Sequence, residues 1–339
     1  MWEDILYFIG GLALIIGGAN VLTDCASAVA RRLKVSELVI GLTVVALGSS
    51  TPDLVVCLTS VIEGHSQLAM GDVLGSNLID VLLVIGVVAV IKPFAPSRMM
   101  MTVDIPMLIL SSFALLFCGD DKLIDGASVN IMNRSDGLML LALFIIYMRF
   151  TFVSAKSTMT SPLSASATTP TKTDTQAATA SAPSKIQVVK TWAGIIAGLV
   201  ALVIGGNWVV SGASGMAKAF GMSESMIGLT VVAFCGAAPD LATAVVATLK
   251  GRIGIALGST IGGCIINVLL CLGLASSIGN VDASHFASID FLALAGGSVF
   301  LWLFCRVFTK GRFTRPEGIL LILAYAAYMA YVVMTANIH

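Results

Sequence analysis

Long runs of apolar residues, separated by short polar stretches, fill almost the whole chain. A helix needs about 20 mostly apolar residues to cross the hydrocarbon core of a bilayer. Gly, Ser and Pro within such runs are tolerated in membrane helices. Ten runs are long enough: 5–24, 38–62, 68–91, 102–118, 137–153, 191–212, 226–249, 253–277, 288–308 and 317–335. The pattern predicts an all-α membrane protein of ten transmembrane helices.

Composition excludes most other classes of protein. Of 339 residues, 57% are hydrophobic and only 11% are charged, whereas a soluble domain has about 25% charged residues. The 19 basic and 19 acidic residues cancel, so no net positive charge indicates binding to nucleic acid. The seven cysteines show no C-x-x-C spacing, and the three histidines are scattered. We therefore expect no redox or zinc site of cysteines or histidines.

The distribution of Lys and Arg predicts how the helices are oriented, because cytoplasmic loops of membrane proteins carry an excess of positive charge. With the N-terminus outside, all but three of the 19 basic residues lie on the inside; the exceptions are Lys122, Arg134 and Lys218. We therefore expect a multi-pass protein of the plasma (inner) membrane with both termini outside.

Residues 155–188 break the apolar pattern. This stretch is rich in Ser, Thr, Ala and Pro and has few side chains to bury, which is typical of disorder. We expect it to be a disordered cytoplasmic linker. It would join a first five-helix unit, residues 1–154, to a second, residues 189–339.

The two units repeat each other at a constant offset, which aligns 36–86 with 223–273 without a gap. In this alignment 21 of 51 positions are identical. Such identity indicates an internal duplication. Since each unit has an odd number of spans, the second copy enters the membrane from the opposite side. Inverted repeats of this kind are the architecture of many secondary transporters.

Each repeat places an aspartate, Asp53 or Asp240, in the middle of a span directly after a proline. An ionised carboxylate at the bilayer centre is costly unless it faces a partner or a water-filled cavity. The proline breaks the helix and releases backbone carbonyls about one turn upstream. The carbonyls that we expect to be released are those of Ala46, Leu47, Ala233 and Phe234. Carboxylate and carbonyl oxygens together suit a hard cation.

The next span of each repeat adds Asp80 and Asn267 at matching positions. If these helices pack at the centre, three carboxylates converge in a medium of low dielectric, where they repel one another unless cations or protons bind. Calcium is the expected ion. Hydroxyl and amide side chains nearby are supporting ligands of second rank, because single polar residues in membrane helices commonly hydrogen-bond to neighbouring helices. They are Thr43, Ser49, Ser50, Ser76, Asn77 and Thr230.

Four further aspartates lie near the predicted ends of spans, where solvent or lipid headgroups can reach a carboxylate. They are Asp24, Asp72, Asp104 and Asp290. We expect these four side chains to cap helices or to reach the membrane surface.

Two pairs of segments carry a resemblance to a known family: GLTVVALGSSTPDL with GLTVVAFCGAAPDL, and GSNLID with GGCIIN. They resemble the two α-repeats of the cation/calcium exchanger superfamily, which includes the sodium/calcium exchangers. The resemblance implies a ten-helix secondary antiporter, not an enzyme, that exchanges calcium for sodium by alternating access and needs no organic cofactor. It also implies that four side chains coordinate calcium: Asp53, Asp240, Asp80 and Asn267. A monomer or weak homo-oligomer in the lipid bilayer is expected.

Three hydroxyl positions of the first repeat have no side-chain oxygen in the second. The pairs are Ser49 with Gly236, Ser50 with Ala237 and Ser76 with Gly263. Because a ligand lost inside a bilayer is not replaced, the coupling ion stays open among sodium, potassium and protons. Sodium/proton or potassium/proton antiport also fits. Alternatives from other classes are a cation channel and an intramembrane aspartyl protease, although the sequence lacks the Gly-x-Gly-Asp element of such proteases.

Overall fold

The computed structural model describes residues 2–33, 35–124, 126–160, 185–219, 236–308 and 312–336. Within these ranges the regular structure is helical apart from a ladder of two short strands and an isolated bridge between Phe94 and Phe313. Eight helices there are long and apolar enough to cross a membrane, or nine if the bent pair Glu37–Ser49 and Thr51–Ile62 forms one span. The all-helical fold is therefore confirmed. The count of ten stays a prediction, because the seventh predicted span, 226–249, is described only from residue 236 onward.

The first half begins with one long helix and continues with two composite spans. In chain order its elements are α1 (Trp2–Leu33), α2 (Glu37–Ile40), the π-helical segment η1 (Gly41–Val45), α3 (Ala46–Ser49), α4 (Thr51–Ile62), α5 (Ser66–Leu78), η2 (Ile79–Val84), α6 (Ile85–Ile91), η3 (Met100–Asp104), α7 (Ile105–Gly119), α8 (Asp121–Ile124), β1 (Ile131–Met132) and α9 (Arg134–Thr160).

The second half, where it is described, has a similar succession of helices. Its elements are α10 (Lys185–Ala219), α13 (Ala238–Leu249), α14 (Ile253–Ile266), η6 (Asn267–Leu272), α15 (Gly273–Ile278), β2 (Val281–Asp282), α16 (Ser288–Leu303), η7 (Phe304–Phe308) and α17 (Arg315–Ala336). Its strand comes before α16 and its last π-helical segment follows α16, whereas in the first half β1 follows α7 and η3 precedes it. The ends of the predicted linker, 155–160 and 185–188, are helical, and its residues 161–184 lie outside the described ranges. The division into a linker and two units stays a prediction.

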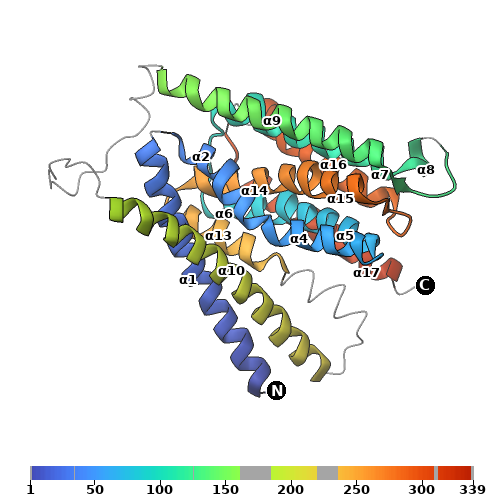
Figure 1. Ribbon diagram of the computed structural model, residues 1–339, viewed down its shortest axis with the longest axis horizontal. Helices are drawn as coiled ribbons and strands as arrows, with labels where there is room; N and C mark the ends of the chain where they lie inside the picture. Colours follow the sequence, from blue (N-terminus) through green and yellow to red (C-terminus); the bar gives the residue numbers. More distant parts are fainter. Residues whose placement is uncertain are drawn as a thin grey trace.

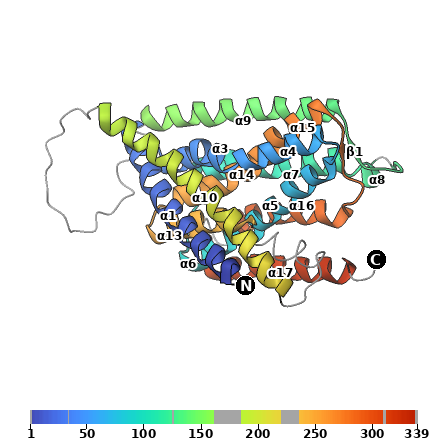
Figure 2. The ribbon, with the colours of Figure 1, turned by 60° about the horizontal axis from the view of Figure 1, so that its bottom comes forward.

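The composite spans Ser66–Ile91 and Ile253–Ile278 form the core of the bundle. In their most apolar stretches 72% and 89% of the residues are buried, compared with 22% in α9 and in α17. Helices that are apolar all round can be enclosed on every side. α9 and α17 lie along opposite edges of the bundle (Figure 2), so much of their apolar surface faces away from the core.

α1 and α10 form an antiparallel pair that lies at a slant to the core helices (Figure 1). Glycines let the two backbones approach closely. A Cβ atom at Gly11 would lie 2.7 Å from the Gly205 carbonyl oxygen, and one at Gly18 would lie 2.8 Å from that of Gly198. Larger side chains would force the helices apart. In the repeat alignment Gly11 matches Gly198 and Gly18 matches Gly205. The relation between the repeats therefore maps each of these two contacts onto the other.

Backbone geometry recurs at matching positions of the two repeats. α4 (Thr51–Ile62) and α13 (Ala238–Leu249) begin and end at aligned residues. The residue before each helix has nearly the same dihedral angles, φ −80° and ψ −1° in one and φ −81° and ψ −3° in the other. Each helix ends in a turn with a glycine at positive φ, +83° at Gly64 and +75° at Gly251, a conformation that favours glycine. The two-repeat organisation stays a prediction, which these equivalences support.

Candidate cation site

The first turn of a helix positions each of the two central aspartates, and in the first repeat this helix follows a break. Glu37–Ser49 and Thr51–Ile62 meet at an angle of 41°. Pro52 stands in the first turn of α4, directly before Asp53, where its missing N–H removes no helical hydrogen bond. α13 begins in the same way, with Pro239 and then Asp240 in its first turn. Each carboxylate thus lies at a helix N-terminus, where the helix dipole favours negative charge.

The backbone carbonyls just upstream of the first proline already have donors. The Ala46 oxygen accepts from the Ser50 N–H at 2.9 Å, and the Leu47 oxygen accepts from the Thr51 hydroxyl at 2.8 Å. The Ala46 oxygen also accepts from the Ser49 hydroxyl at 3.2 Å. Since a carbonyl oxygen has two lone pairs, the prediction that the Ala46 carbonyl is released is wrong, whereas a cation at Leu47 would share the oxygen with its donor. Three other predicted ligand positions lie outside the described ranges: Thr230, Ala233 and Phe234.

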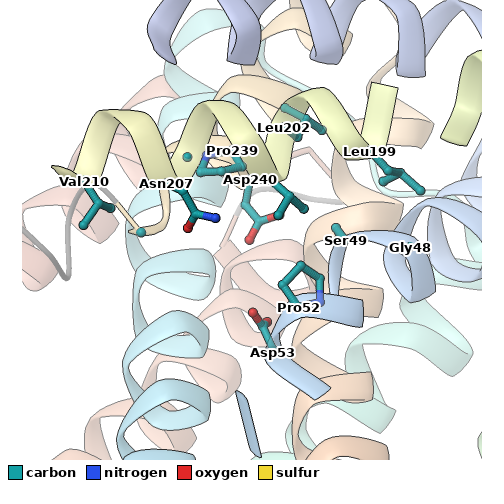
Figure 3. A pocket seen from close by; sticks show the side chains of 13 residues that line it. Gly48, Ser49, Pro52, Asp53, Leu199, Leu202, Asn207, Val210, Pro239 and Asp240 are labelled. Atoms are coloured by element: carbon teal, nitrogen blue, oxygen red, sulfur yellow. The ribbon is translucent and has the colours of Figure 1, made fainter. Parts of the chain in front are cut away.

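Asp53 and Asp240 border the same cavity, which has a volume of about 130 Å³. Figure 3 shows both carboxylates in the space between α10 and the starts of α4 and α13. Ser49 also lines this cavity. The side contributed by α10 is mostly apolar, with one amide: Leu199, Leu202, Val203, Gly206, Asn207 and Val210. The two Pro-Asp turns of the repeats therefore meet at one hollow.

Asn267 connects the two halves at this place. Its Nδ2 donates to Asp53 Oδ2 at 2.8 Å and lies 3.5 Å from Ser76 Oγ. Asn267 is only 3% exposed and is the first residue of η6. A hydrogen bond to an ionised carboxylate is stronger than one between neutral groups. The structure thus brings Asp53, Asn267 and Ser76 together.

Asp80 lies close to this region but is not part of the cavity wall. It is 3% exposed, its Oδ2 lies 3.8 Å from Cys264 Sγ, and its Oδ1 has no hydrogen-bond partner in the described part of the chain. Its charge is near enough to interact with those of Asp240 and Asp53. Among the described residues, no group of three or more Asp, Glu, His or Cys side chains is arranged to hold a metal ion. A cation would therefore also need hydroxyl, amide, carbonyl or water oxygens.

The predicted supporting hydroxyls mostly donate within their own helices. Thr43 donates to the carbonyl four residues earlier at 2.7 Å. Ser49 and Ser76 each donate to the carbonyl three residues earlier at 3.2 Å. Because they act as donors, their oxygens keep lone pairs for a cation. Ser50 is buried, and Asn77 donates to the Cys264 carbonyl at 3.0 Å while its own oxygen has no partner within the described ranges.

Two aspartates differ from the expectation of capping or surface contact, which is wrong for both. Asp72 lies in the middle of α5, its buried Oδ2 has no partner among the described residues, and its charge interacts with those of Asp53 and Asp240. Asp104 is fully buried, and neither of its carboxylate oxygens has a partner in that part of the chain. The helices extend beyond the apolar runs, so these residues lie further inside than the runs indicate.

The same expectation holds for the other two aspartates. Asp290 accepts from the Ala287 N–H at 2.9 Å at the start of α16. Asp24, whose side chain is 60% exposed, pairs with Lys250 at 2.9 Å.

One cavity residue, Asn207, was not among the predicted ligands. Figure 3 shows its side chain entering from α10 into the space beside Asp240. The sequence contained a signal, because the repeat alignment, extended to the first span of each unit, matches Asn207 with Asn20. Both asparagines lie outside the segments of highest repeat identity, which is why the motifs did not include them.

Comparison with known proteins identifies the family. A family model described as sodium/calcium exchanger protein matches residues 4–153 and 190–334. The chain is 32% identical over 326 residues to the putative antiporter CaxA of Alkalimonas amylolytica, covering 95% of this chain and 96% of that protein. It is 28% identical over 343 residues to the sodium/calcium exchanger MaX1 of Methanosarcina acetivorans, covering 96% and 97%.

The fold is also similar to a solved structure. The sodium/calcium exchanger from Methanococcus jannaschii matches with a TM-score of 0.78 and 26% sequence identity, over 97% of this chain and 98% of that one. The family match and the apolar helices make the protein a multi-pass integral membrane protein. The chain therefore belongs to the sodium/calcium exchanger protein family, and it is a cation exchanger, a transporter rather than an enzyme.

Proposed function

We propose that the protein is a secondary antiporter that exchanges calcium for a monovalent cation, with sodium as the first candidate. The observation that carries the proposal is the shared cavity, which Asp53 and Asp240 border together. Asn267 supplies a further polar group at 2.8 Å from Asp53. Carboxylate and amide oxygens are the ligands that calcium prefers in proteins. The names of MaX1 and of the M. jannaschii exchanger, both called sodium/calcium exchangers, support the same pair of ions.

In this proposal Asp53, Asp240 and Asp80 are the charged ligands and Asn267 is a neutral one. The three carboxylates repel one another where little water is present, and a bound cation relieves this repulsion. Calcium, or more than one sodium ion, would balance the negative charge to a similar extent. Binding of one ion then excludes the other, which is the condition for exchange rather than co-transport.

The proposed transport mechanism is alternating access by two inverted repeats of five helices each. Two copies of one structure that face opposite ways give two related states, each open to one side of the membrane. The recurring dihedral angles before α4 and α13 support this organisation. We propose that both termini face outward and that residues 155–188 are cytoplasmic, in the plasma (inner) membrane. A reporter fused to the C-terminus that is active only outside the cell tests this orientation.

Proton or potassium coupling is the second candidate, because the second repeat is poorer in oxygen ligands. Gly236, Ala237 and Gly263 replace serines of the first repeat. A sodium site related by symmetry to one at Ser49, Ser50 and Ser76 would therefore lack hydroxyl ligands. Fewer sodium ions per calcium, or protons on the clustered aspartates, would follow.

Ion flux into vesicles tests the proposal. The purified protein is placed in vesicles loaded with sodium, which are diluted into sodium-free medium containing calcium. We expect calcium uptake that disappears in Asp53→Asn and in Asp240→Asn. Glu63→Gln, which removes an exposed charge at the end of α4, is the matched control and keeps its uptake. Potassium and pH gradients replace the sodium gradient one at a time to identify the coupling ion.

Three outcomes would contradict the proposal. Full calcium uptake in Asp240→Asn would refute the assignment of the site. Calcium flux that needs no gradient of another ion would indicate a channel. Absence of calcium uptake, together with sodium/proton or potassium/proton exchange, would change the transported ion and keep the antiport mechanism.

A further inference from the structure

Asn207 on α10 occupies a defined place in the wall of the cavity that Asp53 and Asp240 border. Its neighbour Gly206 explains why α10 comes so near. A Cβ atom at Gly206 would lie 2.9 Å from Cγ of Pro239, so only a glycine lets α10 pack on the turn that carries Asp240. Asn207 is exposed at this point, and its amide is the one polar side chain that α10 contributes to the cavity.

Asn20 stands at the matching position of α1 in the first repeat, but its surroundings differ. Its Nδ2 donates to the Ile16 carbonyl of its own helix at 2.9 Å. Lys250, in the turn after α13, donates to the backbone carbonyl of Asn20 at 3.1 Å and pairs with the Asp24 carboxylate at 2.9 Å. α1 is therefore closed against the end of α13 near Asn20, whereas α10 borders a cavity at Asn207.

The two environments would exchange if the two repeats exchanged conformation. Asn20 would then line the cavity on the opposite side of the membrane, and Asn207 would lie against the bundle. An asparagine oxygen is a neutral ligand for a hard cation, and it adds no charge to the repulsion among the aspartates. Such a group can hold an entering ion without trapping it.

We infer that Asn207 contacts the transported cation on the side to which this cavity opens, and that Asn20 does the same on the opposite side after the conformational change. The inference rests on the proposed antiport by alternating access. With the N-terminus outside, α10 runs outward and Asn207 lies past its middle, while α1 runs inward and Asn20 lies past its middle. Asn207 thus serves the outer side and Asn20 the inner side.

Calcium uptake into right-side-out and inside-out vesicles tests the two roles separately. Losing one neutral ligand should raise the half-maximal calcium concentration about three- to tenfold. Asn207→Ala shows this rise for calcium supplied from outside and leaves the value from inside unchanged; Asn20→Ala shows the reverse. Asn207→Asp, which adds a negative charge, lowers the outer value. Val200→Ala, at a position of α10 that is 50% exposed and does not line the cavity, is the matched control and changes neither value.

Labelling of introduced cysteines tests the same inference without transport. Asn207→Cys should react with a membrane-impermeant thiol reagent from outside and Asn20→Cys from inside, above the wild-type background, and calcium should protect both. Unchanged calcium affinities from both sides, equal changes from both sides, or labelling that calcium does not affect would overturn the inference. In each of these cases, calcium uptake that still requires Asp240 would leave the proposed function intact. Absence of calcium uptake by the wild-type protein would refute the proposed function itself.

Discussion

Gly263 is the position at which one substitution tests why the two halves differ. It is the counterpart of Ser76 in the second repeat. A Cβ atom there would lie 3.8 Å from Ser50 Oγ and 4.0 Å from Asp80 Oδ2, which are ordinary van der Waals distances. Gly263→Ser therefore fits without moving the backbone. It places a hydroxyl beside Asp80. The first repeat already has the equivalent arrangement, because Ser76 Oγ lies 3.5 Å from Asn267 Nδ2.

The size of the effect follows from the strength of one added ligand. An ordinary hydrogen bond contributes about 0.5–1.5 kcal/mol, and we take the upper part of this range for one added hydroxyl ligand, which is up to about tenfold in a binding constant. Ser76 uses its proton to donate to the Val73 carbonyl at 3.2 Å, and a serine at 263 can do the same and offer its oxygen to a cation. We expect the sodium concentration for half-maximal exchange to fall about three- to tenfold.

Sodium-driven calcium uptake, titrated with sodium, measures this shift. Gly263→Ala adds the same volume without the oxygen and should leave the sodium dependence unchanged. Gly262→Ser adds a hydroxyl where a Cβ would meet Cα of Leu42 at 2.9 Å, so it should lower the melting temperature. If Gly263→Ala shifts the sodium dependence as much as Gly263→Ser, volume rather than oxygen is responsible. If a well-folded Gly263→Ser shows no shift, the number of oxygens does not determine the coupling ion.

Three further predictions use the same vesicles or a thermal melt. Asn267→Ala removes the donor to Asp53 and should raise the half-maximal calcium concentration about tenfold; an unchanged value would exclude Asn267 from the site. Asp104→Asn neutralises a buried carboxylate that has no partner among the described residues, so calcium uptake should persist and the melting temperature should not fall; a clear fall would mean that the charge is paired. Two ion pairs differ in exposure: the side chains of Arg252 and Glu37 are 22% and 33% exposed, and those of Lys250 and Asp24 are 27% and 60% exposed. Exposed ion pairs contribute only about 0–1 kcal/mol, and the Arg252–Glu37 pair is the less exposed of the two. Arg252→Ala should therefore lower the melting temperature more than Lys250→Ala, and equal losses would contradict this.

The residues that sequence reasoning found are those that the duplication marks twice. Asp53 and Asp240 each follow a proline in a segment of high repeat identity, and a charge in the middle of a span is costly enough to need a function. Asn267 matches Asp80 in the same way. The structure places Asp53, Asp240 and Asn267 around one region, as the inverted repeat predicts.

Sequence reasoning missed the positions of Asp72 and Asn207, because these are set by helix starts and tertiary contacts that apolar runs do not reveal. Asp72 was assigned to the end of a span because the run begins at residue 68, yet α5 starts earlier, at Ser66, directly after the turn at Gly64. The depth of a side chain depends on where the helix starts, not on where hydrophobicity starts. Asn207 was missed for a different reason, since the packing of Gly206 on Pro239 is a tertiary contact.

The π-helical segments η2 and η6 show what the two halves share and where they differ. Each has six residues; Asp80 is the second residue of η2 and Asn267 is the first of η6. Such segments are rare and are frequent at functional sites, and the run of apolar residues around them gives no sign of the change in register. The change occurs in both halves although one carries a carboxylate and the other an amide, so the polar side chain is not its cause. At these two segments the halves thus offer nearly the same backbone to different side chains. If the proposed site is correct, the choice of coupling ion depends on a few side chains, and substitutions such as Gly263→Ser can change it without altering the fold.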